Sequence, residues 1–159
     1  MEILISTVGD KLRVKCASRE AFNRQAKSKL RGRYVDGAWE FDSKDETRVR
    51  ALLKKHFAFS GSYETVDVKI TALNQLEVEC GPLILAGRVV AAAENRDGGA
   101  TIGPGVIFEK GKPQSGGSRQ CWTTIIRAGA VWEIHQLFET ALEDLIANSA
   151  LSVEVIEKQ

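Results

Sequence analysis

The stretch Arg33-Tyr34-Val35-Asp36-Gly37-Ala38-Trp39-Glu40-Phe41 decides the fold of the first third of the chain. Its central Asp-Gly separates two runs of strand-forming residues and tolerates the positive φ angles that a two-residue type I′ turn requires. With this turn, Tyr34 lies opposite Trp39 and Arg33 lies opposite Glu40. Strand alternation then places Tyr34, Trp39 and Phe41 on one face. The stretch therefore predicts a hairpin with one apolar face.

An amphipathic helix is expected on each side of this hairpin. Before it, Ser18 is the expected N-cap of a helix that ends near Leu30, where Gly32 stops it. After it, a helix is expected from about Lys44 to His56, introduced by the capping-box pattern of Ser43-Lys44-Asp45-Glu46. Each segment repeats apolar residues at helical spacing, which predicts one buried stripe per helix.

Two short strands, Met1–Ser6 and Leu12–Cys16, are expected ahead of the first helix, joined by a turn that contains Gly9. The order is then strand, strand, helix, strand, strand, helix. This order predicts a compact α+β unit over residues 1–60, and the Gly- and Ser-containing segment 59–62 is the expected junction.

Residues 61–159 have a different character, with short alternating apolar runs separated by Gly, Pro, Asn and Ser. Such punctuation is typical of an antiparallel β-rich unit, a sandwich or a barrel. The expected strands are 66–70, 76–79, 83–93, 102–109, 122–127, 130–134 and 151–156. One late helix is expected over Leu137–Ala147, with Leu137, Leu142, Leu145 and Ile146 facing inward. The fold class predicted for the whole chain is α+β with two units.

Charge is distributed unevenly between the two predicted units. Residues 1–60 contain 14 Lys and Arg against 8 Asp and Glu, whereas residues 61–159 contain 8 against 13. A basic half joined to an acidic half suggests that the first half meets a polyanion. The open alternative is that the two halves, or two copies of the chain, attract each other.

The chain is expected to be cytoplasmic, with no membrane partner. It has no apolar run of the roughly 18 residues that a transmembrane helix needs, and its start has no basic leader. The three cysteines, Cys16, Cys80 and Cys121, are far apart in sequence and lack C-x-x-C spacing. This pattern argues against a disulfide framework or a zinc site and fits a reducing compartment.

Basic side chains at helical spacing form the candidate binding surface. Arg24, Lys27 and Arg31 recur at i, i+3 and i+7 in the first helix, and Lys44, Arg48 and Lys55 share one side of the second. Together with Arg33 of the hairpin, they can contact phosphates as point charges and forks. The predicted phosphate contacts are Arg24, Lys27, Arg31, Arg33, Arg48 and Lys55. The competing interpretation is a solvated helix face.

The aromatic face of the hairpin also has two interpretations. Tyr34, Trp39 and Phe41 resemble a platform on which unpaired bases stack, and Trp39 is the predicted stacking residue. Such a triad is more often a core, here beneath Phe22 and Leu53, because a two-stranded hairpin needs a buried face to be stable.

No motif indicates catalysis or a bound metal or cofactor. His56 and His135 have no neighbouring ligand or triad pattern in sequence, and Cys121 beside Trp122 is expected to be buried. The Gly-rich loops 95–99 and 111–119 lack the residues of a calcium loop or of a phosphate-binding P-loop. They are expected to be mobile or partner-contacting loops. The chain is therefore predicted not to be an enzyme.

Two resemblances add context. Phe22, Lys27, Lys29, Tyr34, Trp39 and Phe41, followed by an amphipathic helix, resemble the HARP domain of annealing helicases, which helps to recognise junctions of single- and double-stranded DNA. The whole chain is similar to a family of short uncharacterised proteins of bacterial mobile elements. The features that carry this second resemblance are Trp39-Glu40-Phe41-Asp42, Arg48-Val49-Arg50, Gly81-Pro82, Leu85-Ala86-Gly87-Arg88 and Ser115-Gly116-Gly117-Ser118.

The first resemblance implies nucleic-acid binding without a motor, and the second implies plasmids, phages or integrated elements. The leading hypothesis is a non-enzymatic nucleic-acid-binding accessory protein; DNA is favoured over RNA as its partner, and both stay open. The second hypothesis is a protein-interaction module, such as an inhibitor of a host defence complex or an oligomeric assembly factor. In that case Glu and Asp of the acidic unit would mimic nucleic acid. A homo-oligomer is compatible with both hypotheses.

Overall fold

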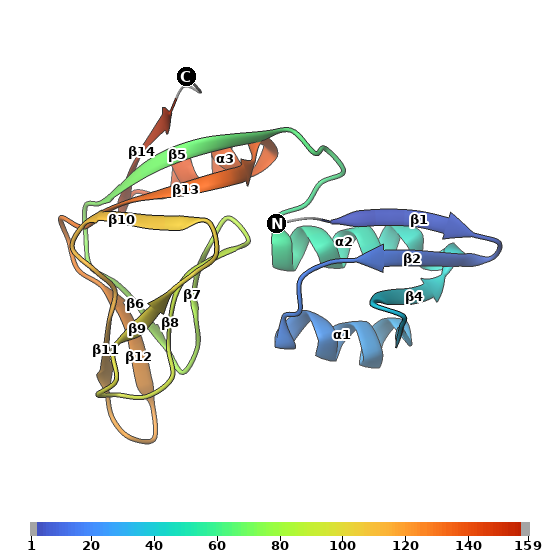
Figure 1. Cartoon of the computed structure of the whole chain (residues 1–159), viewed down its shortest axis with the longest axis horizontal. Helices are drawn as coiled ribbons and strands as arrows, with labels where there is room; N and C mark the ends of the chain where they lie inside the picture. Colours follow the sequence, from blue (N-terminus) through green and yellow to red (C-terminus); the bar gives the residue numbers. More distant parts are fainter. Residues whose placement is uncertain (1–2, 157–159) are drawn as a thin grey trace. The chain divides into compact units, whose positions relative to one another are not determined.

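The computed structural model describes residues 3–156 and divides them into two compact units, up to Gly61 and from Ser62 onward (Figure 1). All strand pairs within these residues are antiparallel, and helices accompany the sheets, so the predicted α+β class is confirmed. Within the same residues, none of the helices is long and apolar enough to span a membrane.

The first unit has the predicted order of two strands, a helix, a hairpin and a helix. Its sheet has the strand order β1-β2-β4-β3. Residues 1–2 of the predicted first strand lie outside the described residues. The elements are β1 (Leu4–Val8), β2 (Lys11–Lys15), α1 (Glu20–Leu30), β3 (Arg33–Val35), β4 (Ala38–Asp42), the 3-10 turn η1 (Ser43–Asp45) and α2 (Glu46–Phe57).

The predicted hairpin register is confirmed: Arg33 pairs with Glu40, Tyr34 with Trp39 and Val35 with Ala38. Asp36 and Gly37 both have positive φ, 51° and 80°, as the type I′ turn requires.

Aromatic side chains fill the core of this unit. Trp39 and Phe41 of β4 are 4% and 2% exposed. The ring of Phe22 on α1 packs edge-on against Trp39 at 6.2 Å and against Phe57 of α2 at 5.3 Å. The guanidinium of Arg19 stacks on the Phe57 ring at 4.3 Å and donates a hydrogen bond to the carbonyl of His56. Through these contacts the two helices pack against the hairpin and against each other.

The cap residues of α1 differ from those predicted, whereas its end does not. α1 begins at Glu20 with Arg19, not Ser18, at the N-cap position. It ends at Leu30, as predicted, and Arg31 after it adopts the left-handed conformation (φ 52°) that was expected of Gly32. Gly32 is needed instead for close approach, since a Cβ there would meet Cε1 of Phe41 at 2.6 Å.

The predicted capping box is also wrong. The residue before η1, Asp42, accepts a hydrogen bond from the Lys44 amide at 3.2 Å, while the Glu46 amide bonds to the backbone carbonyl of Ser43. The Glu46 carboxylate pairs with Arg50 at 3.0 Å instead of reaching back. An Asp one residue earlier in the chain therefore outcompetes Ser43 for the cap.

The second unit consists of a four-stranded sheet, β10-β13-β5-β14, and two three-stranded sheets, β11-β12-β6 and β7-β8-β9. Trp132, Ile134, Ile70 and Val68 of the larger sheet are completely buried. The elements are β5 (Thr65–Ala72), β6 (Leu76–Glu79), β7 (Leu83–Leu85), β8 (Arg88–Ala93), β9 (Ala100–Ile102), β10 (Val106–Lys110), β11 (Gln114–Gly117), β12 (Trp122–Ile126), β13 (Val131–Phe138), the 3-10 turn η2 (Glu139–Ala141), α3 (Leu142–Ala147) and β14 (Leu151–Ile156).

Three predictions for this unit are wrong in detail. The strand expected over 83–93 is a hairpin that turns at Ala86 and Gly87, both with positive φ. The loop expected over 111–119 contains β11, because its backbone pairs with β12. The late helix begins only at Leu142, since Leu137 is the buried end of β13, and Ile146 is 60% exposed.

A buried arginine holds this unit together. Arg88, 5% exposed, donates hydrogen bonds to the carbonyls of Pro104 (2.8 Å), His135 (2.9 Å) and Gln136 (3.1 Å). The last two carbonyls lie in an irregularity of β13 between Ile134 and Leu137, where Gln136 has φ 56°. Gly105 leaves room for the guanidinium, because a Cβ there would lie 2.5 Å from it. Arg88 therefore satisfies the carbonyls that the irregular strand cannot pair.

Replacing Arg88 by Met would leave these carbonyls buried without a donor. We expect the free energy of unfolding of the second unit to fall by about 3 kcal/mol or more, measured by urea denaturation. The matched control is Arg127→Met, because Arg127 is exposed and its guanidinium donates to the side chain of Gln114 at 3.0 Å rather than to buried backbone carbonyls. Equal urea midpoints for the two variants would contradict the role given to Arg88.

Candidate nucleic-acid interface

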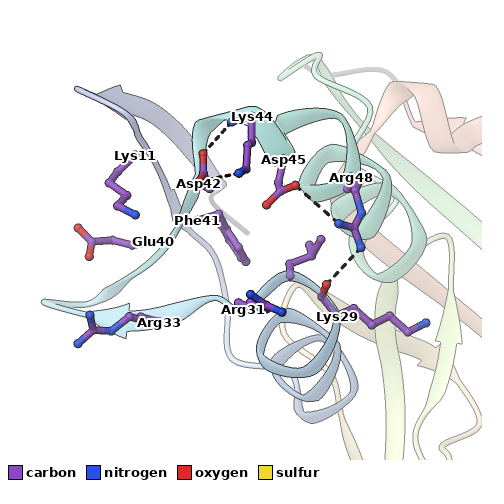
Figure 2. Close-up of a pocket in the computed structure, with 11 residues that line it drawn as sticks. Lys11, Lys29, Arg31, Arg33, Glu40, Phe41, Asp42, Lys44, Asp45 and Arg48 are labelled. Atoms are coloured by element: carbon purple, nitrogen blue, oxygen red, sulfur yellow. Dashed lines mark hydrogen bonds and ion pairs between the residues drawn. The ribbon is translucent and has the colours of Figure 1, made fainter.

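Six cationic side chains of the first unit surround one hollow of about 510 Å³ (Figure 2). It lies beside the start of β3, where β4 continues past Glu40, the partner of Arg33, so that Phe41 and Asp42 line the hollow. Five elements or their ends contribute the cations. The cationic lining residues are Lys11, Lys29, Arg31, Arg33, Lys44 and Arg48, and the acidic ones are Glu40, Asp42 and Asp45.

Two of the six cations are held by neighbouring groups. Arg48 donates a hydrogen bond to the backbone carbonyl of Lys29 at 3.2 Å and pairs with Asp45 at 3.6 Å. Lys44 pairs with Asp42 at 3.6 Å. Figure 2 shows these contacts along the side of the hollow formed by η1 and α2. Arg48 thereby joins the beginning of α2 to the end of α1 and keeps the hollow's shape.

The other four cations have no ion pair within residues 3–156. Lys11, Lys29, Arg31 and Arg33 are all exposed. In Figure 2, Arg31 and Arg33 lie along one side of the hollow and Lys11 lies beside Glu40. With three acids against six cations, the lining carries a formal excess of three positive charges. An anion in the hollow would relieve the repulsion among these cations.

Asp42 keeps its negative charge in this basic setting. The backbone amide of Lys44 donates to its carboxylate, and this hydrogen bond, with the charges of Lys44 and Lys11, holds the pKa of Asp42 below its usual range, although partial burial acts in the opposite direction. Asp42 therefore stays ionised near neutral pH and orients Lys44.

Three of the predicted phosphate contacts come together here and three do not. Arg31, Arg33 and Arg48 line the hollow. Arg24 pairs instead with Glu20 at 3.2 Å, and Lys55 bonds to Gln25 at 3.4 Å. Lys27 is exposed on α1 outside the hollow. The predicted stripe of Arg24, Lys27 and Arg31 is interrupted because Arg31 leaves the helix in a left-handed conformation.

Sequence reasoning left Lys11, Lys29 and Lys44 out of the predicted phosphate contacts, although it placed Lys44 with Arg48 on one side of the second helix. Lys11 comes from β2, and its proximity depends on the pairing of β2 with β4, in which Lys11 lies opposite Asp42. That pairing links residues about 30 positions apart, so no local spacing indicates it. Lys29 lies near the predicted end of the first helix, and Lys44 lies at the predicted start of the second. This position was the signal in the sequence that could have placed them near Arg31 and Arg48.

The stacking residue predicted at Trp39 is wrong, because only 4% of this side chain is exposed. Its ring is covered by Phe22 on one side and stacks on Phe41 at 6.1 Å. Tyr34 is the exposed aromatic, at 60%, and packs edge-on against Trp39 at 5.6 Å. The core interpretation therefore holds for Trp39 and Phe41, and Tyr34 alone of the three offers a free ring surface.

Further cations lie on the sheet itself. A second hollow, of about 290 Å³, has Leu4, Ser6, Arg13, Lys15 and the turn residues 36–38 around it. Arg13 is fixed by donating to the carbonyl of Val35 at 3.3 Å, and Lys15 is exposed. Basic character therefore extends along β2 beyond the main hollow.

The second unit has one cluster of titratable groups that the sequence did not predict. His135 contacts the carboxylate of Glu133 at 2.8 Å through Nε2 and that of Asp67 at 3.2 Å through Nδ1. Glu133 precedes His135 by two positions, on the same face of β13, and Asp67 comes from the neighbouring β5. The hydrogen bond with Glu133, and then that with Asp67, raises the pKa of His135, although burial acts against them.

Among residues 3–156, no three His, Cys, Asp or Glu side chains are grouped so that they could hold a metal ion. Both ring nitrogens of His135 face carboxylates, an arrangement that favours the imidazolium rather than a general base. We therefore regard this cluster as a structural ion pair.

Comparison of the chain with protein-family models, with curated proteins and with solved structures finds no match. The resemblances to HARP domains and to a mobile-element family therefore stay predictions. Any proposal of function has to rest on the site itself.

The raised pKa of His135 makes stability depend on pH. The folded chain favours protonated His135, and this preference contributes to the free energy of unfolding. The contribution is complete below the ordinary histidine pKa of about 6.5 and is lost as pH rises through the folded-state pKa. We expect His135→Gln to remove this decline, measured as urea midpoints of both proteins from about pH 5.5 to 8.5.

His56→Gln is the contrasting control. Burial, followed by the charge of Lys55, lowers the pKa of His56, so the contribution of His56 to stability weakens as pH falls rather than as pH rises. Parallel pH profiles for wild type and His135→Gln would contradict the pairing described for His135.

Proposed function

We propose that the first unit binds the phosphate backbone of a nucleic acid through its basic hollow. The observation that carries the proposal is the convergence of six cations from separate elements, four of them without an ion pair among residues 3–156, around one hollow. Phosphate groups are the polyanion that such exposed Lys and Arg recognise in general, and DNA is the partner we favour.

The chemical character of the lining supports phosphate rather than a carboxylate metabolite. Its groups are almost all charged, and Phe41, at its centre in Figure 2, is 2% exposed. Small-molecule sites are mostly apolar with a few placed polar groups. A polar, open, cationic surface is typical of backbone contacts, which position a nucleic acid without reading its sequence.

Tyr34 supports single-stranded or forked nucleic acid. Its exposed ring belongs to the same strand as Arg33, one residue away, and Arg33 lines the hollow. In the proposed binding mode, a base next to a phosphate held at Arg33 stacks on this ring. Stacking on an aromatic side chain contributes about 1–3 kcal/mol per base and requires an unpaired base.

The proposed activity is binding without catalysis, in the role of an accessory protein of a mobile element. The competing proposal, a module that binds a host protein through the acidic unit, has a weaker basis in the structure. Glu133, one of the acidic residues of that unit, already pairs with His135 at 2.8 Å. We therefore keep nucleic-acid binding as the single proposal.

Neutralising three unpaired cations tests the hollow directly. We expect Lys29→Gln, Arg31→Gln and Arg33→Gln together to weaken binding of labelled single-stranded and forked DNA by tenfold or more at low salt, measured by fluorescence anisotropy. The slope of log affinity against log salt should fall by about two to three, because each lost phosphate contact contributes roughly 0.7–0.9.

The matched control removes the same charge from the second unit. Lys110, Lys112 and Arg119 are exposed there, and their combined replacement by Gln should leave affinity and slope unchanged. Equal losses in both triple variants would show that net charge alone drives binding, and no binding by wild type at low salt would overturn the proposal.

Tyr34→Ala tests the preference for unpaired bases. We expect affinity for single-stranded DNA to fall by about 5- to 100-fold while affinity for duplex DNA stays within twofold. Tyr34→Phe is the control, because it retains the ring and should bind as wild type does. Equal weakening for single strand and duplex would contradict a stacking role.

A further inference from the structure

Two cysteines that are 41 positions apart in sequence meet in the second unit. The Sγ atoms of Cys80 and Cys121 lie 2.8 Å apart, and both are thiols in this structure. Cys80 is exposed and Cys121 is half-buried. The sequence spacing had argued against any disulfide, because it gave no sign that these residues are neighbours.

The antiparallel pairing of β6 and β12 brings the two thiols together. Glu79, at the end of β6, pairs with Thr123 of β12, and the Cys80 amide continues the ladder by donating to the Trp122 carbonyl at 2.8 Å. Cys121 is the next residue along. Both cysteines therefore lie at the same end of one ladder, and their backbones are fixed independently of the thiols.

The surrounding loop holds Cys121 in place. The Cys121 amide donates a hydrogen bond to the Ser118 hydroxyl at 3.0 Å, and the Cys121 carbonyl accepts one from the Ser118 amide at 3.0 Å. Across the ladder, Cys80 has φ 51°, a left-handed conformation that is uncommon for a residue with a side chain. Cys80 and Cys121 therefore both lie in segments whose backbone is held by hydrogen bonds, and neither lies in a mobile loop.

We propose that Cys80 and Cys121 form a reversible disulfide by thiol–disulfide exchange with a low-molecular-weight disulfide such as oxidised glutathione. A disulfide requires an Sγ–Sγ distance of about 2.05 Å, so the sulfurs need to approach by less than about 1 Å. Each cysteine directly adjoins one of the two paired strands, Cys80 after the end of β6 and Cys121 before the start of β12, so the backbone already holds the two sulfurs close to bonding distance.

The exchange proceeds in two steps. The thiolate of one cysteine attacks the small disulfide, which forms a mixed disulfide and releases one equivalent of the small thiol. The second cysteine then loses its proton and attacks the protein sulfur of the mixed disulfide, which forms the Cys80–Cys121 bond and releases the second small thiol. Two thiols of the protein are oxidised and one small disulfide is reduced to two thiols.

Cys80 is the attacking residue and Cys121 the resolving one. Cys80 is the more exposed of the two and is reached first by a small disulfide. The hydrogen bond with Cys80, followed by burial, raises the pKa of Cys121 to about 11, so little of Cys121 is a thiolate near neutral pH. Once Cys80 carries the mixed disulfide, that hydrogen bond no longer exists and Cys121 is free to attack.

The new bond would tie the end of β6 to the loop before β12. It closes a loop that contains β7, β8, β9, β10 and β11, so it constrains the unfolded chain over a long segment. The oxidised second unit is therefore more stable than the reduced one, and reduction restores the original state.

The test uses the full chain, incubated with oxidised glutathione and quenched with a thiol-alkylating reagent. We expect the oxidised chain to take up one alkyl group, on Cys16, where the reduced chain takes up three; apart from the alkyl groups its intact mass is lower by about 2 Da, since two hydrogens are lost. Tryptic digestion should give one cross-linked species that joins residues 70–88 to residues 120–127. The Tm of the second unit should rise on the order of 10 °C and return after reduction.

Two variants sharpen the test. Cys16→Ser should behave as wild type, because burial raises the pKa of Cys16 to about 11 and this thiol belongs to the other unit. Cys121→Ser should stop at a glutathione adduct on residues 70–88. A stable adduct on wild-type Cys80 without the internal bond, a cross-link between two chains, or no reaction would each overturn the proposal.

Discussion

The first unit depends on the burial of Trp39 and Phe41 beneath its two helices. These rings occupy one face of β4; Phe22 of α1 covers Trp39, and Phe57 of α2 packs on Phe22. Because the apolar face of the sheet is covered in this way, the charged residues of the hairpin face outward. After α1 ends at Leu30, Arg31 is left-handed and lines the hollow, and Gly32 lies against the Phe41 ring with no room for a Cβ. The basic hollow therefore directly adjoins the aromatic core.

The second unit meets a different constraint. Its strands are short and β13 is irregular, which leaves carbonyls that no neighbouring strand can pair. Arg88 supplies the missing donors from a third strand and is itself deprived of water. Burial lowers the pKa of the Arg88 guanidinium, yet arginine stays charged at physiological pH. One side chain therefore replaces several backbone hydrogen bonds.

Local signals were sufficient where the interacting residues are adjacent in sequence. Asp36-Gly37 predicts the hairpin and its register because both turn conformation and cross-strand pairing follow from a few neighbouring residues. The same kind of signal was misleading at Ser43, because Asp42 caps the turn through the Lys44 amide and the Glu46 amide bonds to the backbone carbonyl of Ser43. Local signals were also misleading over residues 83–93. The apolar run there predicts one strand, but the chain turns at Ala86 and Gly87, and the positive φ of Ala86 is not expected from its residue type.

The candidate site was only partly predictable for a related reason. Arg31, Arg33 and Arg48 could be named because basic residues near a hairpin are visible in sequence. Which of them converge depends on the pairing of β2 with β4 and on the end of α1, and these also bring in Lys11 and Lys29. Burial decided between Trp39 and Tyr34, since period-two alternation places both on one face but cannot show that the edge strand leaves Tyr34 uncovered.

By itself, the sequence determined the α+β class, the order of elements in the first unit, the hairpin register and the basic character of residues 1–60. All of these follow from interactions between residues a few positions apart or from composition. Only the tertiary structure decided the membership of the basic hollow, the burial of Trp39, the Arg88 hydrogen bonds, and the contacts of His135 and of Cys80 with Cys121. These depend on contacts between distant segments, and local periodicity carries no information about which distant segments pair.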